Sequence, residues 1–319
     1  MPKAYSQKPI VIAHRGASGY LPEHTLLAVT AAHIMGADYI EQDIVLSSDG
    51  IPMVMHDIYL DTTTDVATQF PRRARADGRY YAIDFSASEL KQLSVTERSG
   101  SNDTPVYPGR FPIIPLGMEI PTLKEEINLI NGLNKSRGTD TGFYIELKAP
   151  HFHRDAGFDI AQAVITVLQA DNLHCEHANV YLQCFDDKTL QYLRETLETP
   201  LPLIMLIAEN SWQENSAVDY DWLRTHEGLD YIAQFADGIG PWLPQLYKAD
   251  TITPSDLVVE AKGRGLKVHP YTIRADDLAL GVHTVDELHT RMFIDLGVDG
   301  VFSDFPDKTR FFIDNHFGI

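Results

Sequence analysis

The segment that decides the fold reads Tyr39-Ile40-Glu41-Gln42-Asp43-Ile44-Val45. Apolar side chains fall on both of its faces, which is typical of a parallel strand that is covered on both sides. Because side chains alternate along a strand, Glu41 and Asp43 point to the same face. The segment therefore predicts a buried parallel strand that carries two carboxylates on one face.

Similar short apolar runs recur along the chain and alternate with longer amphipathic stretches. We expect strands at Ile10–Ala13, Tyr39–Val45, Phe143–Leu147, Val180–Gln183, Leu203–Ile207, Gly238–Gly240, Lys267–Tyr271 and Gly300–Phe302. We expect helices at His24–Met35, Leu123–Leu133, Phe158–Gln169, Asp187–Leu197 and Pro254–Lys262. Eight such units in roughly 300 residues fit an α/β fold of the (β/α)₈ type, the TIM barrel. A doubly wound sheet is the structural alternative.

Two stretches interrupt this alternation. The turn residues Ser47–Gly50, followed by Pro52–His56, predict a hairpin that springs from the second barrel strand. Residues 57–121 then show no repeat unit and are too long for a structureless loop, so we expect a small inserted subdomain. Residues Glu209–Tyr220 form a second, smaller polar insertion. We expect residues 1–319 to form one barrel domain with the insertion at 57–121.

The composition excludes some classes of protein. With 26 basic and 45 acidic residues, the formal charge is −19, and no basic cluster of a nucleic-acid binder is visible. The hydrophobic fraction of 44% and charged fraction of 22% are ordinary for a soluble enzyme. No apolar run approaches the roughly 18 residues that span a bilayer, so we expect no stable membrane insertion. Any site for an anionic ligand must therefore carry its own local positive charge.

The cysteines and the start of the chain give little information about function or localisation. Cys175 and Cys184 form no disulfide framework or zinc motif, and we expect two small buried thiols. Met1 to Pro9 is short and polar and lacks the apolar core of a signal peptide. The protein is either cytoplasmic or the product of a trimmed precursor. The oligomeric state stays open, a dimer being one option.

Three carboxylates predict a metal site. Glu41 and Asp43 on a buried strand would cost several kcal/mol unless compensated, and a divalent cation compensates them directly. Glu146 and Lys148 share a face at the C-terminal end of another apolar strand, where barrel active sites lie. Carboxylates suit Ca²⁺ or Mg²⁺ better than zinc. The alternatives are carboxylates at an exposed strand end and a structural Glu146–Lys148 ion pair.

Two histidines complete a set of groups suited to phosphate chemistry. His14-Arg15-Gly16 directly follows the first strand, at the same end of the barrel. Imidazoles act as acid or base near neutral pH, and the guanidinium of Arg15 matches phosphate geometry. His56 closes the hairpin that leaves the carboxylate strand and can lean back over the same site. Lys148 adds a point charge for a phosphate oxygen.

These residues occur as an ordered set of motifs that resembles the glycerophosphodiester phosphodiesterase family. The motifs are His14-Arg15-Gly16-Ala17-Ser18-Gly19, Pro22-Glu23-His24-Thr25, Glu41-x-Asp43, His56-Asp57, Glu146-x-Lys148, Gln183-x-Phe185, His269-Pro270-Tyr271 and Ser303-Asp304-x-Pro306. The blocks at 77–81 and 107–112 resemble the large insertion of the bacterial periplasmic branch. On that resemblance we expect a periplasmic protein, with the cytoplasm as the alternative.

The resemblance implies a metal-dependent hydrolase of small-molecule glycerophosphodiesters, such as those of choline, ethanolamine or glycerol, that releases sn-glycerol 3-phosphate and an alcohol. It implies one divalent cation, with Ca²⁺ as the first choice and Mg²⁺ as the alternative, held by Glu41, Asp43 and Glu146. His14 and His56 would be the acid–base pair. Arg15 and Lys148 would contact the phosphate of the substrate.

The remaining matches allow more than one interpretation. Gln183 ends an apolar strand and either supports the metal or phosphate or is a buried structural amide. Phe185 and Tyr271, with Trp242 as a further candidate, either form an apolar wall for the glycerol group or pack at the barrel rim. Asp304 orients Lys148 or a histidine, or caps a helix. Rival functions are a related phospholipid-cleaving phosphodiesterase and a non-catalytic barrel that binds phosphate or Ca²⁺.

Overall fold

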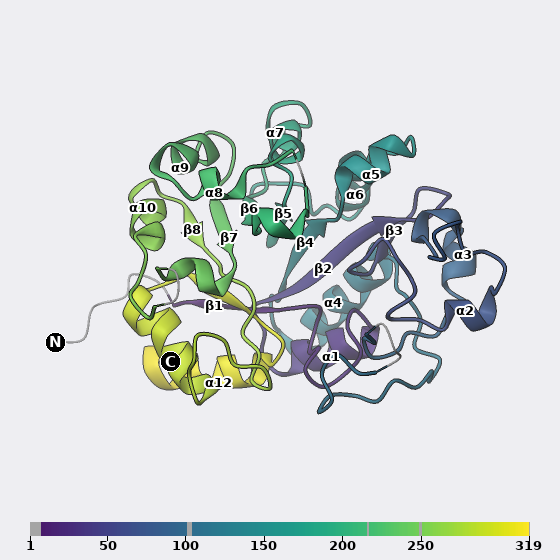
Figure 1. Ribbon diagram of the computed structural model, residues 1–319, viewed down its shortest axis with the longest axis horizontal. Coiled ribbons are helices and arrows are strands. Elements are labelled where there is room, and N and C mark those ends of the chain that lie inside the picture. Colours follow the sequence, from purple (N-terminus) through teal and green to yellow (C-terminus); the bar gives the residue numbers. More distant parts are fainter. Residues whose placement is uncertain (1–7, 101–103, 216, 249–250, 319) are drawn as a thin grey trace.

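Eight parallel strands form the centre of the molecule (Figure 1). The computed structural model describes residues 8–100, 104–215, 217–248 and 251–318. The strands are β1 (Ile10–Ala13), β2 (Tyr39–Leu46), β4 (Gly142–Leu147), β5 (Val180–Cys184), β6 (Leu203–Ile207), β7 (Gly238–Pro241), β8 (Lys267–Val268) and β9 (Gly300–Ser303). Their spatial order is β8-β7-β6-β5-β4-β2-β1-β9, and each pair along it is parallel.

The two ends of this strand order meet. The Asp299 N–H donates to the Val268 carbonyl at 3.0 Å, and the Phe302 N–H donates to the Pro270 carbonyl at 3.0 Å. These bonds join the segment of β9 to that of β8, so the sheet curls into a barrel. The TIM-barrel prediction is confirmed, and the doubly wound alternative, which is an open sheet, is wrong.

Helices follow most of the strands and cover the outside of the barrel. The α-helices outside the insertion are α1 (Leu26–Ile34), α4 (Leu123–Arg137), α5 (Pro150–Asp155), α6 (Ile160–Ala170), α7 (Asp187–Glu195), α8 (Tyr220–Leu223), α9 (His226–Ile232), α10 (Leu257–Gly263), α11 (Val285–His289) and α12 (Pro306–Phe317). Short 3₁₀ turns η2 (Asn210–Trp212) and η3 (Leu243–Leu246) and the π-helical η4 (Thr290–Leu296) complete them. Their apolar faces and the outer faces of the strands share one large hydrophobic cluster.

The inside of the barrel is filled by large side chains. Ile12, Tyr144, Ile204 and Phe302 are buried there as a separate cluster. The Tyr144 hydroxyl lies 2.9 Å from Nδ1 of His269, which satisfies two polar groups in an otherwise apolar interior. Because the interior is packed, the polar residues at the C-terminal ends of the strands surround a cavity rather than a channel.

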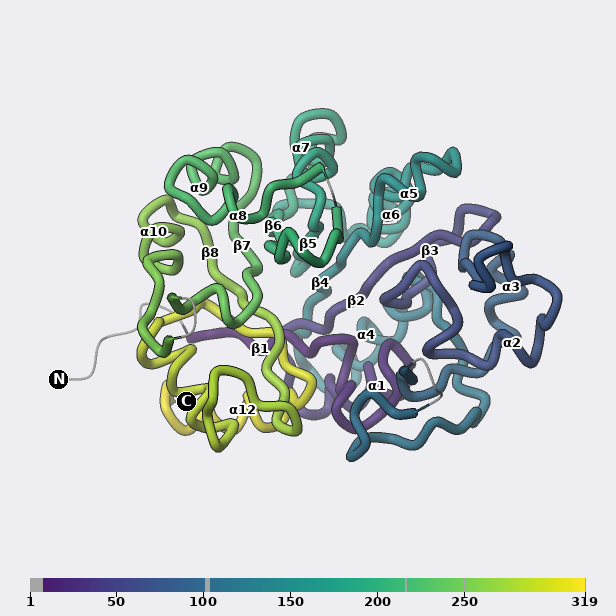
Figure 2. Tube along the Cα trace, viewed as in Figure 1, coloured from purple at the N-terminus to yellow at the C-terminus, as the bar shows by residue number. Residues whose placement is uncertain are grey.

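The segment between β2 and α4 leaves the barrel and returns (Figure 2). The antiparallel strand β3 (Pro52–Val54) pairs with β2, as the hairpin prediction requires. It is followed by α2 (Val66–Gln69), η1 (Ala82–Asp84) and α3 (Ala87–Leu90), which lie at the right edge of Figure 1. These elements share a second hydrophobic cluster with β3, which includes Leu60, Phe85 and Leu90. Its separate core is consistent with a subdomain, but the domain division at 57–121 stays a prediction.

Two details differ from the sequence-based expectations. The strand expected at Lys267–Tyr271 keeps regular strand geometry only over Lys267–Val268, because Pro270 has no N–H for the ladder. Cys175 is exposed, so the expectation of two buried thiols is wrong for this residue; Cys184 is buried, and both thiols are free. Cys175 lies on the loop after α6 rather than on a strand.

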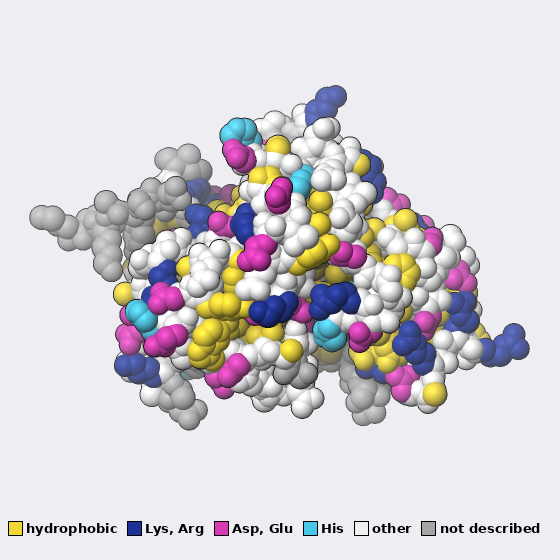
Figure 3. Space-filling view, turned by 90° about the horizontal axis from the view of Figure 1, so that it is seen from above, with side chains coloured by type: hydrophobic (Ala, Val, Ile, Leu, Met, Phe, Trp, Pro, Cys, Tyr) yellow, Lys and Arg dark blue, Asp and Glu magenta, His cyan; other side chains and the backbone are white. Residues whose placement is uncertain are grey.

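The outer surface mixes charges of both signs. On the face seen in Figure 3, acidic and basic side chains are interspersed, with hydrophobic groups between them. In the described part of the chain, no helix combines the length and the apolar character needed to cross a membrane.

Candidate active site

The loop between β1 and α1 brings a histidine and an arginine to the C-terminal end of the barrel. Arg15 has a positive φ of 56°, and Gly16 follows with a φ of 80°. A Cβ on Gly16 would lie 2.8 Å from the backbone of Ala28, so only glycine fits this turn against α1. The turn directs the Arg15 N–H to Oε2 of Glu41 at 2.7 Å, which ties the loop to β2.

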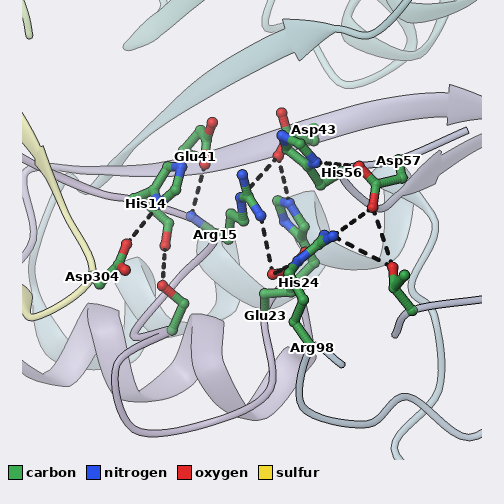
Figure 4. Close-up of polar contacts among 12 residues, drawn as sticks. His14, Arg15, Glu23, His24, Glu41, Asp43, His56, Asp57, Arg98 and Asp304 are labelled. Carbon is green, nitrogen blue, oxygen red and sulfur yellow. Dashed lines mark hydrogen bonds and ion pairs between the residues drawn. The ribbon is translucent and has the colours of Figure 1, made fainter. Parts of the chain in front are cut away.

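Each of the two predicted catalytic histidines is held by an aspartate through Nδ1. His14 Nδ1 lies 2.6 Å from Oδ1 of Asp304, and His56 Nδ1 lies 2.6 Å from Oδ1 of Asp57 (Figure 4). An Nδ1–H donated to a carboxylate leaves Nε2 as the proton acceptor. Of the roles considered for Asp304, the structure therefore shows orientation of a histidine, and the N-cap of α12 is Phe305.

The pKa values of both imidazoles are low. Burial, followed by the positive charge of Arg15, lowers the pKa of His14 to about 4. Burial, followed by the charges of Arg15 and Lys148, lowers the pKa of His56 to about 3. Both imidazoles are neutral at neutral pH. An anion bound between these cations would offset part of their effect and raise the pKa values again.

The predicted carboxylates lie in neighbouring strands on the same face. In the register of the sheet, Asp43 on β2 pairs with Glu146 on β4, and Glu146 pairs with Gln183 on β5. Glu41, Asp43 and Glu146 are at most 5% exposed. Gln183 Nε2 donates to Oε1 of Glu41 at 3.3 Å. The structure thus brings all four side chains together at the carboxyl end of the barrel.

Two of these three acids lack enough compensating positive charge, whereas at Asp43 the effect of burial is outweighed by His56 and Lys148, which lower its pKa well below the usual value. Burial and the charge of Asp43 raise the pKa of Glu41 well above its usual value. Burial raises the pKa of Glu146 to about 8, although Lys148 acts in the opposite direction. The oxygens Asp43 Oδ1 and Gln183 Oε1 have no hydrogen-bond partner among the described residues. Buried, unpaired oxygen ligands beside carboxylates are the donor set that a hard divalent cation requires, so the residues present fit such an ion.

His24 joins this group, although the sequence motifs did not predict it as a site residue. Ligand atoms of His24, Glu41 and Asp43 lie within 4.8 Å of one another, a grouping that a metal ion accepts. His24 Nε2 also lies 2.8 Å from Oδ2 of Asp43 (Figure 4). Glu146 is outside this grouping and lies 2.7 Å from Nζ of Lys148. The ion pair considered for Glu146 and Lys148 is therefore present, next to the group of side chains that could hold a metal ion.

Two cations flank the acids. Arg15 lies between Asp43, at 3.5 Å, and Glu23, at 3.0 Å, and Lys148 Nζ lies 3.5 Å from Nε2 of His56. Both side chains line the same cavity as the histidines. Their charges are therefore placed where an anionic group of a ligand would meet the imidazoles.

The cavity itself has a volume of about 280 Å³ and two chemically different walls. His14, Glu41, His56 and Lys148 form the polar side. Aromatic rings form the other: Phe185 contacts Tyr271 edge-to-face at 6.0 Å, and Trp242 contacts Trp212 at 5.0 Å. The Tyr271 hydroxyl donates to the Ile207 carbonyl at 2.8 Å, so its ring rather than its hydroxyl is available to a ligand.

Several further residues of the site were not predicted. Glu23 accepts from Arg15 and from Arg98, and Arg98 also donates to Asp57, so the insertion is tied to both histidine-bearing loops (Figure 4). Arg274 and Trp212 also line the cavity. Glu23 and His24 follow the His14 motif within ten residues, and this proximity was an available signal. Arg98 lies 75 residues from Glu23 in sequence, and no local pattern connects them.

Comparison with known proteins identifies the family. The model of the glycerophosphoryl diester phosphodiesterase family matches residues 14–308. The chain is 40% identical to a glycerophosphodiester phosphodiesterase of Haemophilus influenzae, over 93% of this chain and 88% of that protein. It is 35% identical to a glycerophosphodiester phosphodiesterase of Treponema pallidum, over 93% of this chain and 90% of that protein.

Solved structures agree with the fold. A protein from Silicibacter pomeroyi that is assigned as a glycerophosphoryl diester phosphodiesterase superposes with a TM-score of 0.73 over 97% of this chain and 94% of that one, at 23% identity. A phosphodiesterase from Oleispira antarctica, solved in complex with the product sn-glycerol-3-phosphate, superposes with a TM-score of 0.64 over 98% and 99% of the two chains, at 26% identity. The chain therefore belongs to the glycerophosphoryl diester phosphodiesterase family, and it is an enzyme that hydrolyses glycerophosphodiesters.

Proposed function

We propose that the enzyme cleaves diesters such as glycerophosphocholine, glycerophosphoethanolamine and glycerophosphoglycerol into sn-glycerol 3-phosphate and an alcohol, with His14 and His56 as the acid–base pair. The observation that carries the proposal is a cavity whose lining combines both imidazoles, two buried carboxylates, Arg15 and Lys148. The Oleispira phosphodiesterase, whose structure contains sn-glycerol-3-phosphate, has the same fold and supports this product.

In this proposal Arg15 and Lys148 bind the non-bridging oxygens of the phosphate and hold it between the imidazoles. Nε2 of His14 accepts the proton of the attacking glycerol hydroxyl. Nε2 of His56, which is protonated once the bound phosphate has raised the pKa of this imidazole, donates a proton to the oxygen of the departing alcohol. The resulting cyclic phosphate is opened by water while the two histidines exchange roles. Direct attack of water on phosphorus is the competing route.

Glu41, Asp43 and Glu146 would hold a divalent cation, with Ca²⁺ as the first choice and Mg²⁺ as the alternative. When bound, the cation would neutralise these carboxylates and lower the pKa of a substrate hydroxyl that it contacts. His24, through its hydrogen bond to Asp43, would fix the orientation of that carboxylate. Gln183 would act as a neutral partner of Glu41, and the rings of Phe185 and Tyr271 would pack against the carbon atoms of glycerol.

The test incubates the protein with glycerophosphocholine before and after treatment with a chelator, and then restores Ca²⁺ or Mg²⁺. We expect release of sn-glycerol 3-phosphate that the chelator abolishes and a divalent ion restores. Release that is indifferent to chelation would remove the cation from the proposal. Absence of sn-glycerol 3-phosphate release under every condition would contradict the proposal that glycerophosphocholine is a substrate.

A second measurement tests the metal site without activity. Ca²⁺ at about 100 times its Kd should stabilise the wild type against unfolding by about 2.7 kcal/mol. Glu41→Gln should lose this stabilisation, yet be no less stable than the wild type in chelator, because burial and Asp43 already oppose ionisation of Glu41. Glu195→Gln, at an exposed position on α7, is the matched control and should respond to Ca²⁺ like the wild type.

A further inference from the structure

A second cavity, of about 190 Å³, adjoins the first. Both cavities are lined by His14, Arg15, His56 and Arg274. From these shared residues the first cavity extends to the aromatic wall of Phe185 and Tyr271. The second extends instead toward the insertion, whose residues Glu97, Arg98, Tyr107 and Arg110 line it. The phosphate-binding region of the proposed function therefore has space on two sides.

The second cavity is not a simple anion site, although four arginines line it in the described structure. Each guanidinium is paired with one or two carboxylates. The pairs are Arg15 with Glu23 and Asp43, Arg98 with Glu23 and Asp57, Arg110 with Asp276 and Asp304, and Arg274 with Asp304. Five carboxylates thus balance four guanidiniums before Glu97 is counted, so the positive charge of the arginines is compensated locally.

Glu97 is the acid of this cavity that lacks such a partner. It is 4% exposed, and its Oε2 has no hydrogen-bond partner among the described residues. Burial, followed by the charge of Glu23, raises the pKa of Glu97 to about 7. The neighbouring acids Glu23, Asp57 and Asp304 all have pKa values below their usual range, because the arginines and histidines that they contact outweigh burial. The backbone N–H of Arg98 donates to the Glu97 carboxylate, but one of its two oxygens is left without a partner. A buried carboxylate oxygen without a partner, on a residue that lines a cavity, calls for a donor from a ligand.

The geometry of phosphoryl transfer shows which group of the substrate reaches Glu97. The attacking and leaving oxygens lie roughly in line on opposite sides of phosphorus, so a diester needs one space for each alcohol. The cavity with Glu41 and the aromatic wall suits the carbon chain and hydroxyls of glycerol. The cavity with Glu97 is then the space for the departing alcohol. In Figure 4, Glu41 and Arg98, which line the respective cavities, lie on different sides of Arg15.

We propose that Glu97 is a specificity-determining residue that binds the leaving alcohol and favours one bearing a primary ammonium group, as in ethanolamine. A primary ammonium donates hydrogen bonds to the Glu97 carboxylate, whereas a trimethylammonium group has no N–H to donate. The carboxylate gains an ionic partner. The ammonium group loses hydrogen bonds to water when it binds, and the hydrogen bonds that it donates to the carboxylate replace them. The inference rests on the proposed function, because it assumes that the diester spans both cavities.

The test compares two substrates that differ in this group. Glu97→Gln keeps the shape of the side chain and should fold, since the carboxyl is already partly neutral. We expect kcat/KM for glycerophosphoethanolamine to fall about tenfold relative to kcat/KM for glycerophosphocholine, the scale of one charged hydrogen bond. Glu119→Gln is the matched control on the same insertion segment; its side chain is 56% exposed and paired with Lys91, and the substrate ratio should not change.

A binding measurement repeats the comparison without turnover. In a His14→Ala background, calorimetry with Ca²⁺ present should show the Kd of glycerophosphoethanolamine rising about tenfold on adding Glu97→Gln, with a much smaller change for glycerophosphocholine. Equal losses for both diesters, or none, would overturn the role of Glu97 while leaving the proposed function intact. A wild type that hydrolyses neither diester would overturn the proposed function and this inference with it.

Discussion

At the scale of single residues, the site depends on paired side chains rather than on isolated ones. His14 with Asp304 and His56 with Asp57 repeat the same arrangement, a carboxylate at Nδ1 with Nε2 directed elsewhere. The two aspartates come from different parts of the chain, 290 residues and one residue away from their histidines. Both remain ionised, since contact with the imidazoles and with arginines lowers their pKa values. The pairing therefore fixes the ring orientations and leaves each Nε2 available for proton transfer.

Removing either imidazole should slow the reaction strongly. We expect His14→Ala and His56→Ala each to lower kcat by at least about a hundredfold, the usual scale of acid–base assistance. Steady-state release of sn-glycerol 3-phosphate from glycerophosphocholine is the measurement. His151→Ala, at an exposed position on α5, is the control and should keep the wild-type rate. Near-wild-type rates in both site variants would exclude the two-histidine scheme.

The sequence predicted residues whose position follows from strand geometry. Glu41, Asp43 and Glu146 stand out as charges in apolar strands, and strand alternation places them on one face. The partners that complete the site are set by tertiary contacts instead. Arg98 and Glu97 come from the insertion, which has no periodicity, and their contact with the site depends on how 65 residues of irregular chain fold back on the barrel. The pattern of charges along the sequence does not show where the insertion contacts the barrel.

At the scale of elements, the strands were predicted more closely than the helices. β1 and β6 have the predicted bounds, and β2, β5, β7 and β9 extend one residue further, because short apolar runs between turns define a buried strand well. Helix ends depend on capping, which shifts them by a few residues: α1 begins at Leu26 behind its N-cap Thr25, two residues later than expected. α4 continues to Arg137, where Gly138 with a φ of 67° ends it.

The N-terminus of α4 offers a test of local capping. Thr122 accepts from the Glu125 N–H, and Glu125 accepts from the Thr122 N–H, which forms a complete capping box where the insertion rejoins the barrel. We expect Thr122→Ala to lower the free energy of unfolding by about 1 kcal/mol and to leave kcat/KM unchanged. Urea unfolding of the two proteins measures the difference. Asn131→Ala, exposed within the same helix, should be neutral or slightly stabilising. A loss as large as that of Thr122→Ala would show that the capping box is not the cause.

At the scale of the whole molecule, buried neutral histidines occur in the hydrophobic core as well as in the candidate active site. His269 lies inside the barrel. His289, the last residue of α11, packs against α12, where its ring contacts Phe312 and its Nε2 lies 3.0 Å from Oγ1 of Thr309. Burial lowers the pKa of each to about 3. The folded protein therefore resists protonation at positions far apart, and acid acts on its global stability rather than only on catalysis.

This gives a pH dependence whose sign follows from the lowered pKa. Between the unfolded pKa of about 6.5 and the folded pKa of about 3, the unfolded chain binds a proton at His289 that the folded chain does not. The stability contributed by the neutral imidazole is thus full above about pH 6.5 and is lost as pH falls. We expect each such histidine to reduce the free energy of unfolding by about 1.4 kcal/mol between pH 7.5 and pH 5.5. Urea unfolding at both pH values measures the loss.

His289→Gln cannot be protonated, so its loss over this interval should be smaller than that of the wild type by about 1.4 kcal/mol, whatever its stability at pH 7.5. Replacement of the exposed His151 by Gln should leave the pH dependence unchanged. Parallel losses in wild type and His289→Gln would mean that His289 titrates alike in the folded and unfolded chains.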